Sequence, residues 1–558
     1  MAGIENEVAE AVSRPIFAVF EGGGAKGIAH VGALQAIQDN RLEIIGVAGT
    51  SAGALIAVLS AIGLEASDVM SADVAGADIL SHHGQSPISL LGDREWRSFE
   101  RLQKHGKRTL LAGAAVGLIV NWLLAPRIMS TLSNGFGRKG HFRTTRIQTF
   151  INTVIRDRLA DIAAQAELDW PIPEKVTFAD LDRGWPTVVP LKIVATDVDQ
   201  GTLEIFDAHA TPDVIVAEAV AASISIPIVF EPAAIPSFRP GRFADGGMVS
   251  NLPIWSFAEE KLAYEREHFA RPPVPVIGFR FQSTAAANET PGAQIGFFPF
   301  LSRLVGAALQ GSQGTTDRFL DDVTIVPLAT ELTTLDFDAN WSTLARAREA
   351  GRLSADRHLR FALQAKPDRI ETELRAVRDA TLDVINAKRA ASGSRAVKQL
   401  RVNVIQPYGR YSLRVMESVG METDADDRLL LDRRGRGAAE VFRERGLRHF
   451  RLGAKHDDRP REFMTKYERA LVRRSVRSVL CVPIFEDGVA WSLVEDQRPV
   501  PAGILALDSD ENLATDFDDN DLMGMLVEQS VILYEVVSTE VDDGESGGKE
   551  DAEEGREA

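Results

Sequence analysis

Cysteine is almost absent from this sequence, because Cys481 is the single cysteine among 558 residues. One thiol cannot form an internal disulfide, and it cannot supply a cysteine-rich metal site. We therefore expect a reducing, cytoplasmic environment, and the sequence predicts no metal and no cofactor. Cys481 lies in an apolar run at residues 478–483, where we expect a small buried residue of a strand.

An excess of positive charge is also missing. The chain has 62 Lys and Arg against 80 Asp and Glu, which is a formal net charge of −18. This balance argues against a general nucleic-acid-binding protein, which needs clustered positive charge. Residues 1–15 hold several acids and no long apolar core, so no secretory signal is expected. The remaining composition is typical of globular proteins, and the length suits two to four domains.

The most informative local pattern surrounds Ser51. Apolar residues at 44–48 predict a strand, residues 49–53 (Gly-Thr-Ser-Ala-Gly) predict a sharp turn, and residues 54–62 predict a helix. A serine in such a turn points its hydroxyl away from the sheet, near the first free N–H groups of the helix. Gly49 and Gly53 allow the strand and the helix to approach closely. The pattern therefore predicts a nucleophile elbow.

A glycine-rich loop precedes this turn. Residues 16–20 predict a buried strand, residues 21–27 read Glu-Gly-Gly-Gly-Ala-Lys-Gly, and a helical pattern follows at residues 28–37. Free N–H groups in such a loop can bind an anion or a developing oxyanion. The spacing of the glycines does not fit a dinucleotide-binding or phosphate-binding loop. We therefore interpret the loop as an oxyanion hole.

Ser51 needs a base, and Asp245 is the best-placed candidate. Residues 242–245 predict a short strand that delivers Asp245 into the glycine turn at Gly246 and Gly247. Taken alone, this pattern also fits a tight Asp-Gly turn without a catalytic role. None of the ten histidines stands in an obvious strand-end motif, so each is expected in a surface or loop position.

Together, the glycine-rich loop, the Gly-x-Ser-x-Gly turn and the distant Asp-Gly-Gly resemble the patatin-like phospholipase family. Residues 222–227 (Ala-Ser-Ile-Ser-Ile-Pro) and 335–338 (Leu-Asp-Phe-Asp) are also similar to family segments, so the resemblance covers about residues 15–359. It implies an α/β fold, a three-layer sandwich with a mainly parallel sheet. Glu21 stands where the family usually has Asp, and Lys26 where Arg is common.

The resemblance also implies a function and a set of site residues. Ser51 would be the nucleophile and Asp245 the base of a Ser-Asp dyad that cleaves ester bonds of phospholipids or related acyl lipids through an acyl-enzyme. The implied oxyanion residues are Gly22, Gly23 and Gly24, and the implied supporting residues are Lys26, Gly27, Gly246 and Gly247. Two alternatives stay open: an esterase that pairs Ser51 with a histidine, and a lipid-binding or signalling protein with a vestigial site.

Residues 101–146 form a basic stretch without any Asp or Glu, and this stretch contains an apolar run at residues 109–125. The run is shorter than the roughly 20 residues that span a bilayer. We expect a lipid-contacting segment whose cationic flanks are attracted to anionic headgroups at the inner face of the membrane. A buried helix that lines the acyl pocket and a membrane span are the alternatives.

The C-terminal part begins with an amphipathic helical pattern between residues 365 and 395, which could pack on its own domain or pair with a second copy. Strands are predicted at residues 400–405, 411–415, 476–483 and 502–508, and helices at residues 434–443 and 519–537. This order resembles an α+β GAF domain, which implies regulation by a small ligand or dimerisation. Arg433, Arg434 and Arg436 could meet an anionic ligand or could be solvated surface residues.

The expected domain organisation has five parts. An N-terminal segment (1–14) precedes a patatin-like acyl hydrolase domain (15–362) that includes the basic stretch (101–146). A linker helix (363–399), a GAF-like sensory domain (400–540) and an acidic, disordered tail (541–558) follow.

Overall fold

The computed structural model describes residues 14–71, 78–83, 140–268, 274–282, 323–334, 336–408, 411–421, 424–452 and 466–538. These residues form two compact units, and the main division of the chain falls between Leu359 and Arg360. The apolar run at 109–125, most of the basic stretch and the acidic tail lie outside the described residues, so the expectations for them stay predictions. No helix within the described ranges is long and apolar enough to cross a membrane.

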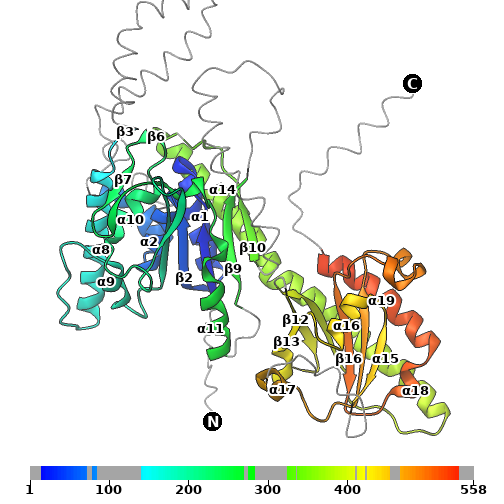
Figure 1. Ribbon diagram of the computed structural model, residues 1–558. Helices are drawn as coiled ribbons and strands as arrows, with labels where there is room; N and C mark the ends of the chain where they lie inside the picture. The colour runs from blue at the N-terminus through cyan, green and yellow to red at the C-terminus, as the bar shows by residue number, and fades with distance from the viewer. Residues whose placement is uncertain are drawn as a thin grey trace, which may run out of the picture. The chain divides into compact units, whose positions relative to one another are not determined.

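A mixed sheet organises the first unit (Figure 1). Its strands follow the order β10-β9-β1-β2-β4-β8-β7, and β5 also pairs with β4. The parallel members are β1 (Arg14–Phe20), β2 (Leu42–Thr50), β4 (Leu191–Asp197), β9 (Val276–Phe281) and β10 (Val323–Leu328). The antiparallel members are β5 (Thr202–Phe206), β7 (Ala233–Ile235) and β8 (Arg239–Asp245). The predicted α/β fold with a mainly parallel sheet is confirmed.

Helices flank this sheet, and the long ones are α1 (Ile28–Asp39), α2 (Ala52–Ala61), α8 (Thr145–Gln165), α10 (Val216–Ser223), α11 (Ala258–His268) and α14 (Trp341–Arg360). Residues 16–20 of β1 are buried without alternation, as expected for a strand with both faces covered. A short parallel pair, β3 (Gly140–Phe142) with β6 (Ile228–Phe230), lies outside the main sheet. The remaining short helices are α3 (Ala66–Val69), α4 (Ile79–His82) and α9 (Phe178–Asp182).

The second unit has an antiparallel sheet in the order β13-β12-β11-β16-β15-β14. The strands are β11 (Arg401–Tyr408), β12 (Ser412–Val419), β13 (Leu430–Asp432), β14 (Arg448–Arg451), β15 (Ser478–Ile484) and β16 (Gly503–Ser509). The helices are α15 (Lys366–Ala391), α16 (Ala438–Glu444), α17 (Lys466–Leu471), α18 (Ala514–Phe517) and α19 (Asn520–Ser538). The predicted strands and the two predicted C-terminal helices are present with shifted ends.

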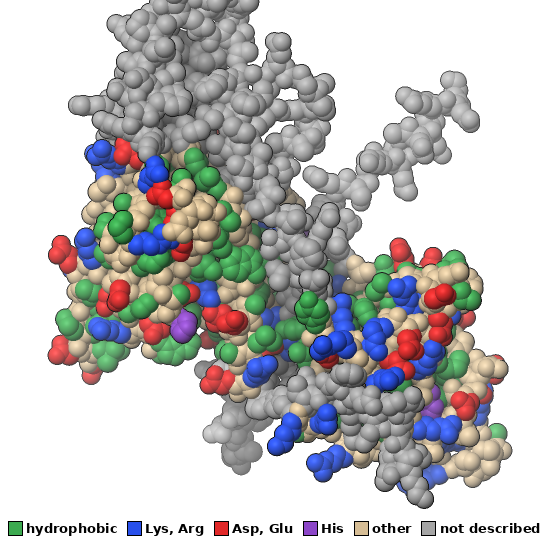
Figure 2. All heavy atoms as spheres, viewed as in Figure 1, with side chains coloured by type: hydrophobic (Ala, Val, Ile, Leu, Met, Phe, Trp, Pro, Cys, Tyr) green, Lys and Arg blue, Asp and Glu red, His purple; other side chains and the backbone are tan. Residues whose placement is uncertain are grey.

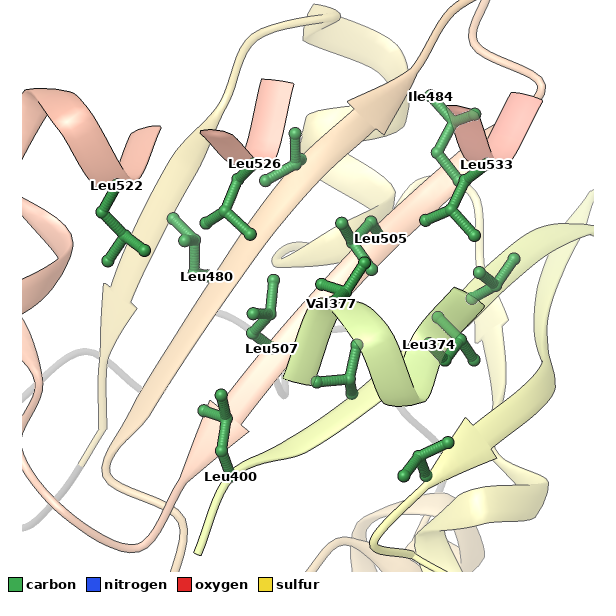
Figure 3. Packing of buried hydrophobic residues seen from close by; sticks show 14 of the residues in the cluster. Leu374, Val377, Leu400, Leu480, Ile484, Leu505, Leu507, Leu522, Leu526 and Leu533 are labelled. Carbon is green, nitrogen blue, oxygen red and sulfur yellow. The ribbon is translucent and has the colours of Figure 1, made fainter. Parts of the chain in front are cut away.

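Alternating residues of the second sheet form two apolar cores. Figure 3 shows Leu374 and Val377 of α15 and Leu526 of α19 packed toward Leu480 and Leu505 of the sheet. Residues of the opposite face, including Cys481, pack with α16 instead. The apolar face of α15 therefore packs on its own domain, and Cys481 is the buried strand residue that the sequence predicts.

Candidate active site

Strand β4 brings the candidate nucleophile and the candidate base together. Thr50, the last residue of β2, pairs with Val194, and Asp245, the last residue of β8, pairs with Ala195. Because β5 occupies the opposite edge of β4, β2 and β8 share one edge. They run in opposite directions along it, so their C-terminal ends meet. Because their partners Val194 and Ala195 are adjacent on β4, the ends of β2 and β8 place Ser51 and Asp245 side by side.

Ser51 lies at the sharp turn between β2 and α2. Its backbone angles, φ 54° and ψ −123°, are ones that residues other than glycine rarely adopt. A Cβ on Gly49 would lie 2.2 Å from the Gly53 carbonyl oxygen, and a Cβ on Gly53 would lie 2.1 Å from the Phe20 carbonyl oxygen. Both positions therefore require glycine, because strand, turn and helix pack without room for a side chain.

Asp245 is wholly buried, with 0% of its surface exposed. Its Oδ1 accepts a hydrogen bond from the Gly247 N–H at 2.8 Å, while Oδ2 has no hydrogen-bond partner among the described residues. Burial raises the pKa of the Asp245 carboxyl to about 6, and the nearby Ser51 hydroxyl and the Gly247 N–H partly offset this rise. A carboxylate with a raised pKa beside a serine hydroxyl can act as a general base.

The N–H groups of the glycine-rich loop have different partners. The Gly22 N–H donates to the Asn251 carbonyl oxygen at 3.1 Å, and the Ala25 N–H donates to the Thr334 carbonyl oxygen at 3.0 Å. Within the described part of the chain, the N–H groups of Gly23 and Gly24 have no backbone acceptor. The predicted oxyanion set therefore divides into Gly22, whose N–H anchors the loop, and Gly23 and Gly24, whose N–H groups have no backbone acceptor among the described residues.

Two close contacts hold this loop against the elbow. A Cβ on Gly22 would lie 2.9 Å from the Ser51 Cβ, and a Cβ on Gly27 would lie 2.8 Å from the Ala52 Cβ. Gly24 has φ +57°, and a Cβ there would lie 2.2 Å from the Thr334 carbonyl oxygen. The loop can follow this path beside Ser51 only with glycine at these positions.

A buried carboxylate ties the loop to its surroundings. Glu21 Oε1 accepts a hydrogen bond from Asn251 Nδ2 at 3.0 Å, and Oε2 accepts one from the Phe281 N–H at 2.6 Å. Asn251 Nδ2 also donates to the Gly22 carbonyl oxygen at 3.1 Å. Asn251 was not among the predicted site residues, although it follows shortly after Asp245 in the sequence. Its role depends on long-range contacts that no local motif records.

The other predicted supporting residues lie around the same site. Lys26 Nζ is 5.9 Å from the centre of the Phe281 ring. A Cβ on Gly246 would lie 2.3 Å from the Val194 carbonyl oxygen, so glycine is required where β8 leaves β4. Gly247 contributes the N–H that binds Asp245. Each of these residues acts on the loop or the turn rather than on the Ser51 hydroxyl itself.

His30 is the described histidine on the helix that follows the glycine-rich loop. Its Nε2 lies 2.8 Å from the Glu21 carbonyl oxygen, and its ring contacts those of Phe20 and Phe281. Burial lowers the pKa of His30 to about 4, and the hydrogen bond with Glu21 partly offsets this shift. The expectation of surface or loop positions is wrong for His30 and for His358, because both are buried in helices.

No group of three or more His, Cys, Asp or Glu side chains within the described ranges is placed to hold a metal ion. The site described above consists of a serine, a carboxylate and backbone N–H groups. These are the components of nucleophilic ester chemistry.

The second unit contains a separate cavity of about 110 Å³. Its lining is mainly apolar and includes Ile405, Leu431 and Cys481, while Arg401, Asn403 and Asp508 contribute polar groups. Asn403 is 4% exposed, and its Oδ1 has no hydrogen-bond partner among the described residues. The cavity therefore combines apolar walls with an unsatisfied polar atom.

The three arginines that the sequence singles out have partners of their own, and Arg436 is the one of the three that lines the cavity. Arg434 pairs with Asp432 at 2.6 Å, Arg436 lies 3.5 Å from Glu440, and Arg433 donates to the Ser412 carbonyl oxygen at 3.1 Å. Figure 2 shows positive and negative side chains mixed over the visible face of this unit. Arg434 is exposed, whereas Arg433 and Arg436 are partly buried, so both alternatives for these arginines stay predictions.

Comparisons with known proteins match part of the first unit to a family. Residues 18–258 match the profile of the patatin-like phospholipase family. The uncharacterized protein YqhO of Bacillus subtilis is 27% identical over 253 residues, which cover 44% of this chain and 67% of that protein. Together with the sheet and the glycine-rich loop, the family match supports lipid hydrolase activity.

Solved structures show more distant likeness. VipD from Legionella pneumophila is 18% identical to this chain, with a TM-score of 0.34. The alignment covers 68% of this chain and 77% of the VipD chain. A second solved structure is the GAF domain of an Acinetobacter phosphoenolpyruvate-protein phosphotransferase, which is 15% identical to this chain, with a TM-score of 0.18. The alignment covers 31% of this chain and 90% of the GAF domain chain. Likeness at this level carries no functional conclusion. Residues 18–258 of the chain form a patatin-like phospholipase domain.

Proposed function

We propose that the first unit, at about residues 15–362, is a phospholipase A-type lipid acyl hydrolase. It would cleave carboxylic ester bonds of phospholipids or related acyl lipids with Ser51 as the nucleophile and Asp245 as the base. The observation that carries this proposal is the buried Asp245 carboxyl beside the Ser51 elbow, with a raised pKa and an Oδ2 that has no partner among the described residues. A buried carboxyl that has only a backbone N–H and a serine hydroxyl as neighbours, and no cation among the described residues, is costly to folding, which supports a catalytic reason for it.

In the acylation step, Ser51 Oγ forms a bond to the ester carbonyl carbon while Asp245 accepts the hydroxyl proton. The carbonyl oxygen becomes an oxyanion, which the N–H groups of Gly23 and Gly24 stabilise. The tetrahedral intermediate then collapses, the carbon–oxygen bond to the alcohol breaks, and Asp245 returns the proton to the leaving oxygen. The products of this step are the free alcohol portion of the lipid and an acyl-Ser51 ester.

In the deacylation step, a water molecule attacks the acyl-Ser51 carbonyl carbon and transfers a proton to Asp245. The same N–H groups stabilise the second oxyanion. When this intermediate collapses, the bond between the acyl carbon and Ser51 Oγ breaks, the fatty acid leaves, and Asp245 returns the proton to Ser51 Oγ. The raised pKa of Asp245 suits both steps, because an ordinary carboxylate is too weak a base to share a proton with a serine near neutral pH.

The direct test is lipid mass analysis after incubation of mixed phospholipid vesicles with the wild type or Ser51→Ala. The proposal expects free fatty acid and a lysolipid or deacylated product only with the wild type. Equal product with Ser51→Ala would contradict the nucleophile, and no product with the wild type would favour the alternative of a lipid-binding protein with a vestigial site. Activity that survives Asp245→Asn but is lost when a single histidine is replaced with alanine would favour the serine-histidine alternative.

We further propose that the enzyme acts as a peripheral protein at the cytoplasmic face of the membrane, with the basic stretch as its attachment. Each Lys or Arg near an anionic surface contributes about 1 kcal/mol of attraction. Replacing Lys104, Lys107 and Arg108 with Glu should therefore weaken sedimentation with anionic liposomes. Unchanged sedimentation together with unchanged turnover on vesicles would refute this part of the proposal.

A second function is proposed for the second unit, namely regulation by a small ligand. Its support is the cavity with apolar walls and the unsatisfied Asn403 Oδ1. Native mass spectrometry of the full chain should detect a bound small molecule, and Ala506→Leu, which fills the cavity, should lose it and change turnover. If no molecule is bound and Ala506→Leu leaves turnover unchanged, the regulatory proposal fails. A homodimer remains open and would be visible in the same spectrum.

A further inference from the structure

We infer that Ser223 is a positioning residue that holds the backbone of Ser51 and thereby sets the position of its hydroxyl relative to Asp245. This inference rests on the proposed hydrolase function and adds a residue to it. Ser223 is the last residue of α10, and its Oγ accepts a hydrogen bond from the Ser51 N–H at 2.8 Å. Ser223 is wholly buried, so no solvent molecule can easily take its place.

The Ser51 backbone needs such a partner because its conformation is unfavourable. A residue other than glycine at φ 54° and ψ −123° is stable only when its surroundings hold it there. The Ser51 N–H is also buried in a tight turn, where an N–H without an acceptor would destabilise the native state. The hydroxyl of Ser223 supplies the acceptor. The same bond occupies the Ser51 N–H, so this group is not a further oxyanion donor.

The segment that carries Ser223 also holds the base. The Asp245 N–H donates to the carbonyl oxygen of Ser225 at 2.9 Å. Ser225 is in turn fixed to the end of α10, because its N–H donates to the Ala222 carbonyl oxygen at 3.1 Å and its Oγ to the Ala221 carbonyl oxygen at 2.6 Å. One short rigid segment therefore contacts the backbones of both dyad residues and fixes their separation.

A misplaced nucleophile lowers turnover more than it lowers substrate binding. Displacement of reacting groups by about 1 Å can cost on the order of 100-fold in rate. Loss of the Ser223 hydroxyl should therefore lower kcat by about 10- to 100-fold with little change in KM, because Ser223 itself does not touch the substrate. A residue that only stabilises the fold would leave kcat of the folded protein unchanged.

The test compares Ser223→Ala and Ser223→Cys with the matched control Ser478→Ala in the full chain. Ser478 is also wholly buried, and its Oγ accepts the Leu513 N–H at 2.9 Å, but it belongs to the second unit. The readouts are kcat and KM on a soluble p-nitrophenyl ester, thermal stability, and hydrogen–deuterium exchange of the peptide that contains Ser51. The inference expects kcat to fall in the order wild type, Ser223→Cys, Ser223→Ala, with Ser478→Ala equal to wild type.

Exchange at Ser51 should be faster in Ser223→Ala and unchanged in Ser478→Ala. The inference would be overturned if Ser223→Ala kept the wild-type kcat, or if Ser223→Ala and Ser478→Ala lowered kcat equally. Either result would leave the hydrolase proposal intact. A wild type without turnover on any ester would instead refute the hydrolase proposal, and with it the catalytic role of Ser223.

Discussion

Asp245 in the first unit and Asp508 in the second are both buried aspartates, and burial raises the pKa of each to about 6. Their surroundings differ. Asp508 Oδ1 accepts a charge-assisted hydrogen bond from Arg401 Nε at 2.6 Å, and Arg401 also binds Asp424 and Asp426. Asp245 has a serine hydroxyl and a backbone N–H as neighbours, and no cation pairs with it among the described residues.

Burial raises the pKa of both carboxyls, while the partner of each carboxyl decides what it can do. Arg401 holds Asp508 Oδ1 in a structural ion pair, so we expect Asp508 to stabilise its domain. Asp245 Oδ2 has no such partner and lies beside a nucleophile, so it can accept a proton. Three predictions test this distinction.

The largest expected effect is on turnover. Asp245→Asn should lower kcat by about 1,000-fold, because the amide cannot accept the Ser51 proton. Asp508→Ala should lower the turnover of a folded sample far less than Asp245→Asn, because Asp508 lines the cavity of the other unit and could affect turnover only through the proposed regulation. Hydrolysis of a soluble ester measures both variants, and similar losses in the two would remove the distinction drawn between them.

The next effect is on the free energy of unfolding, which Asp245→Asn should raise and Asp508→Ala should lower. The Asp245 pKa is higher in the folded state than its ordinary value of 3.8, so its ionisation destabilises the fold as the pH rises through about 6. Asp245→Asn should therefore raise the free energy of unfolding at pH 7 by about 2 to 3 kcal/mol. This gain should vanish below about pH 4, where the aspartate is protonated in both states.

Asp508→Ala should lower the free energy of unfolding by about 2 kcal/mol, because Arg401 Nε would lose its acceptor inside the core. Urea denaturation at pH 7 and at pH 4 measures both shifts. A loss of stability in Asp245→Asn at pH 7 would show that Asp245, like Asp508, has a structural role.

The smallest effect is the pH dependence of turnover. Because the ionised form of Asp245 is the base, kcat should fall about tenfold per pH unit below the pKa of about 6. The activity would be measured on a soluble ester between pH 4.5 and 8 with Asp508→Ala as the control, which should show the same acid limb. An acid limb near pH 4 would mean that the reacting carboxyl is not the buried Asp245.

Much of the first unit could be predicted from the sequence because its signals are local. The apolar run before residue 49, the glycines of the elbow and the Asp-Gly-Gly turn each reflect a steric requirement within a few residues. The same holds for the strands of the second unit, where alternating apolar residues such as Leu480 and Val482 face one core and Cys481 faces the other.

The rest depends on contacts between distant segments, which leave no local pattern. The meeting of β2 and β8 along one edge of β4, the capture of the Gly22 N–H by Asn251, and the hydrogen bond from Ser51 to Ser223 are all of this kind. The burial of His30 was not predicted either. In the folded protein its ring contacts the rings of two phenylalanines, but the sequence around His30 would be the same whether its side chain were exposed or buried.

The most direct measurement of the central claim is intact-protein mass spectrometry after brief exposure to a fluorophosphonate probe. The wild type should gain one phosphonyl adduct that peptide analysis places on Ser51. Asp245→Asn should react far more slowly, and Asp508→Ala should react much faster than Asp245→Asn. An unlabelled Ser51 in the wild type, or equal labelling rates in the wild type and Asp245→Asn, would contradict a serine nucleophile activated by Asp245.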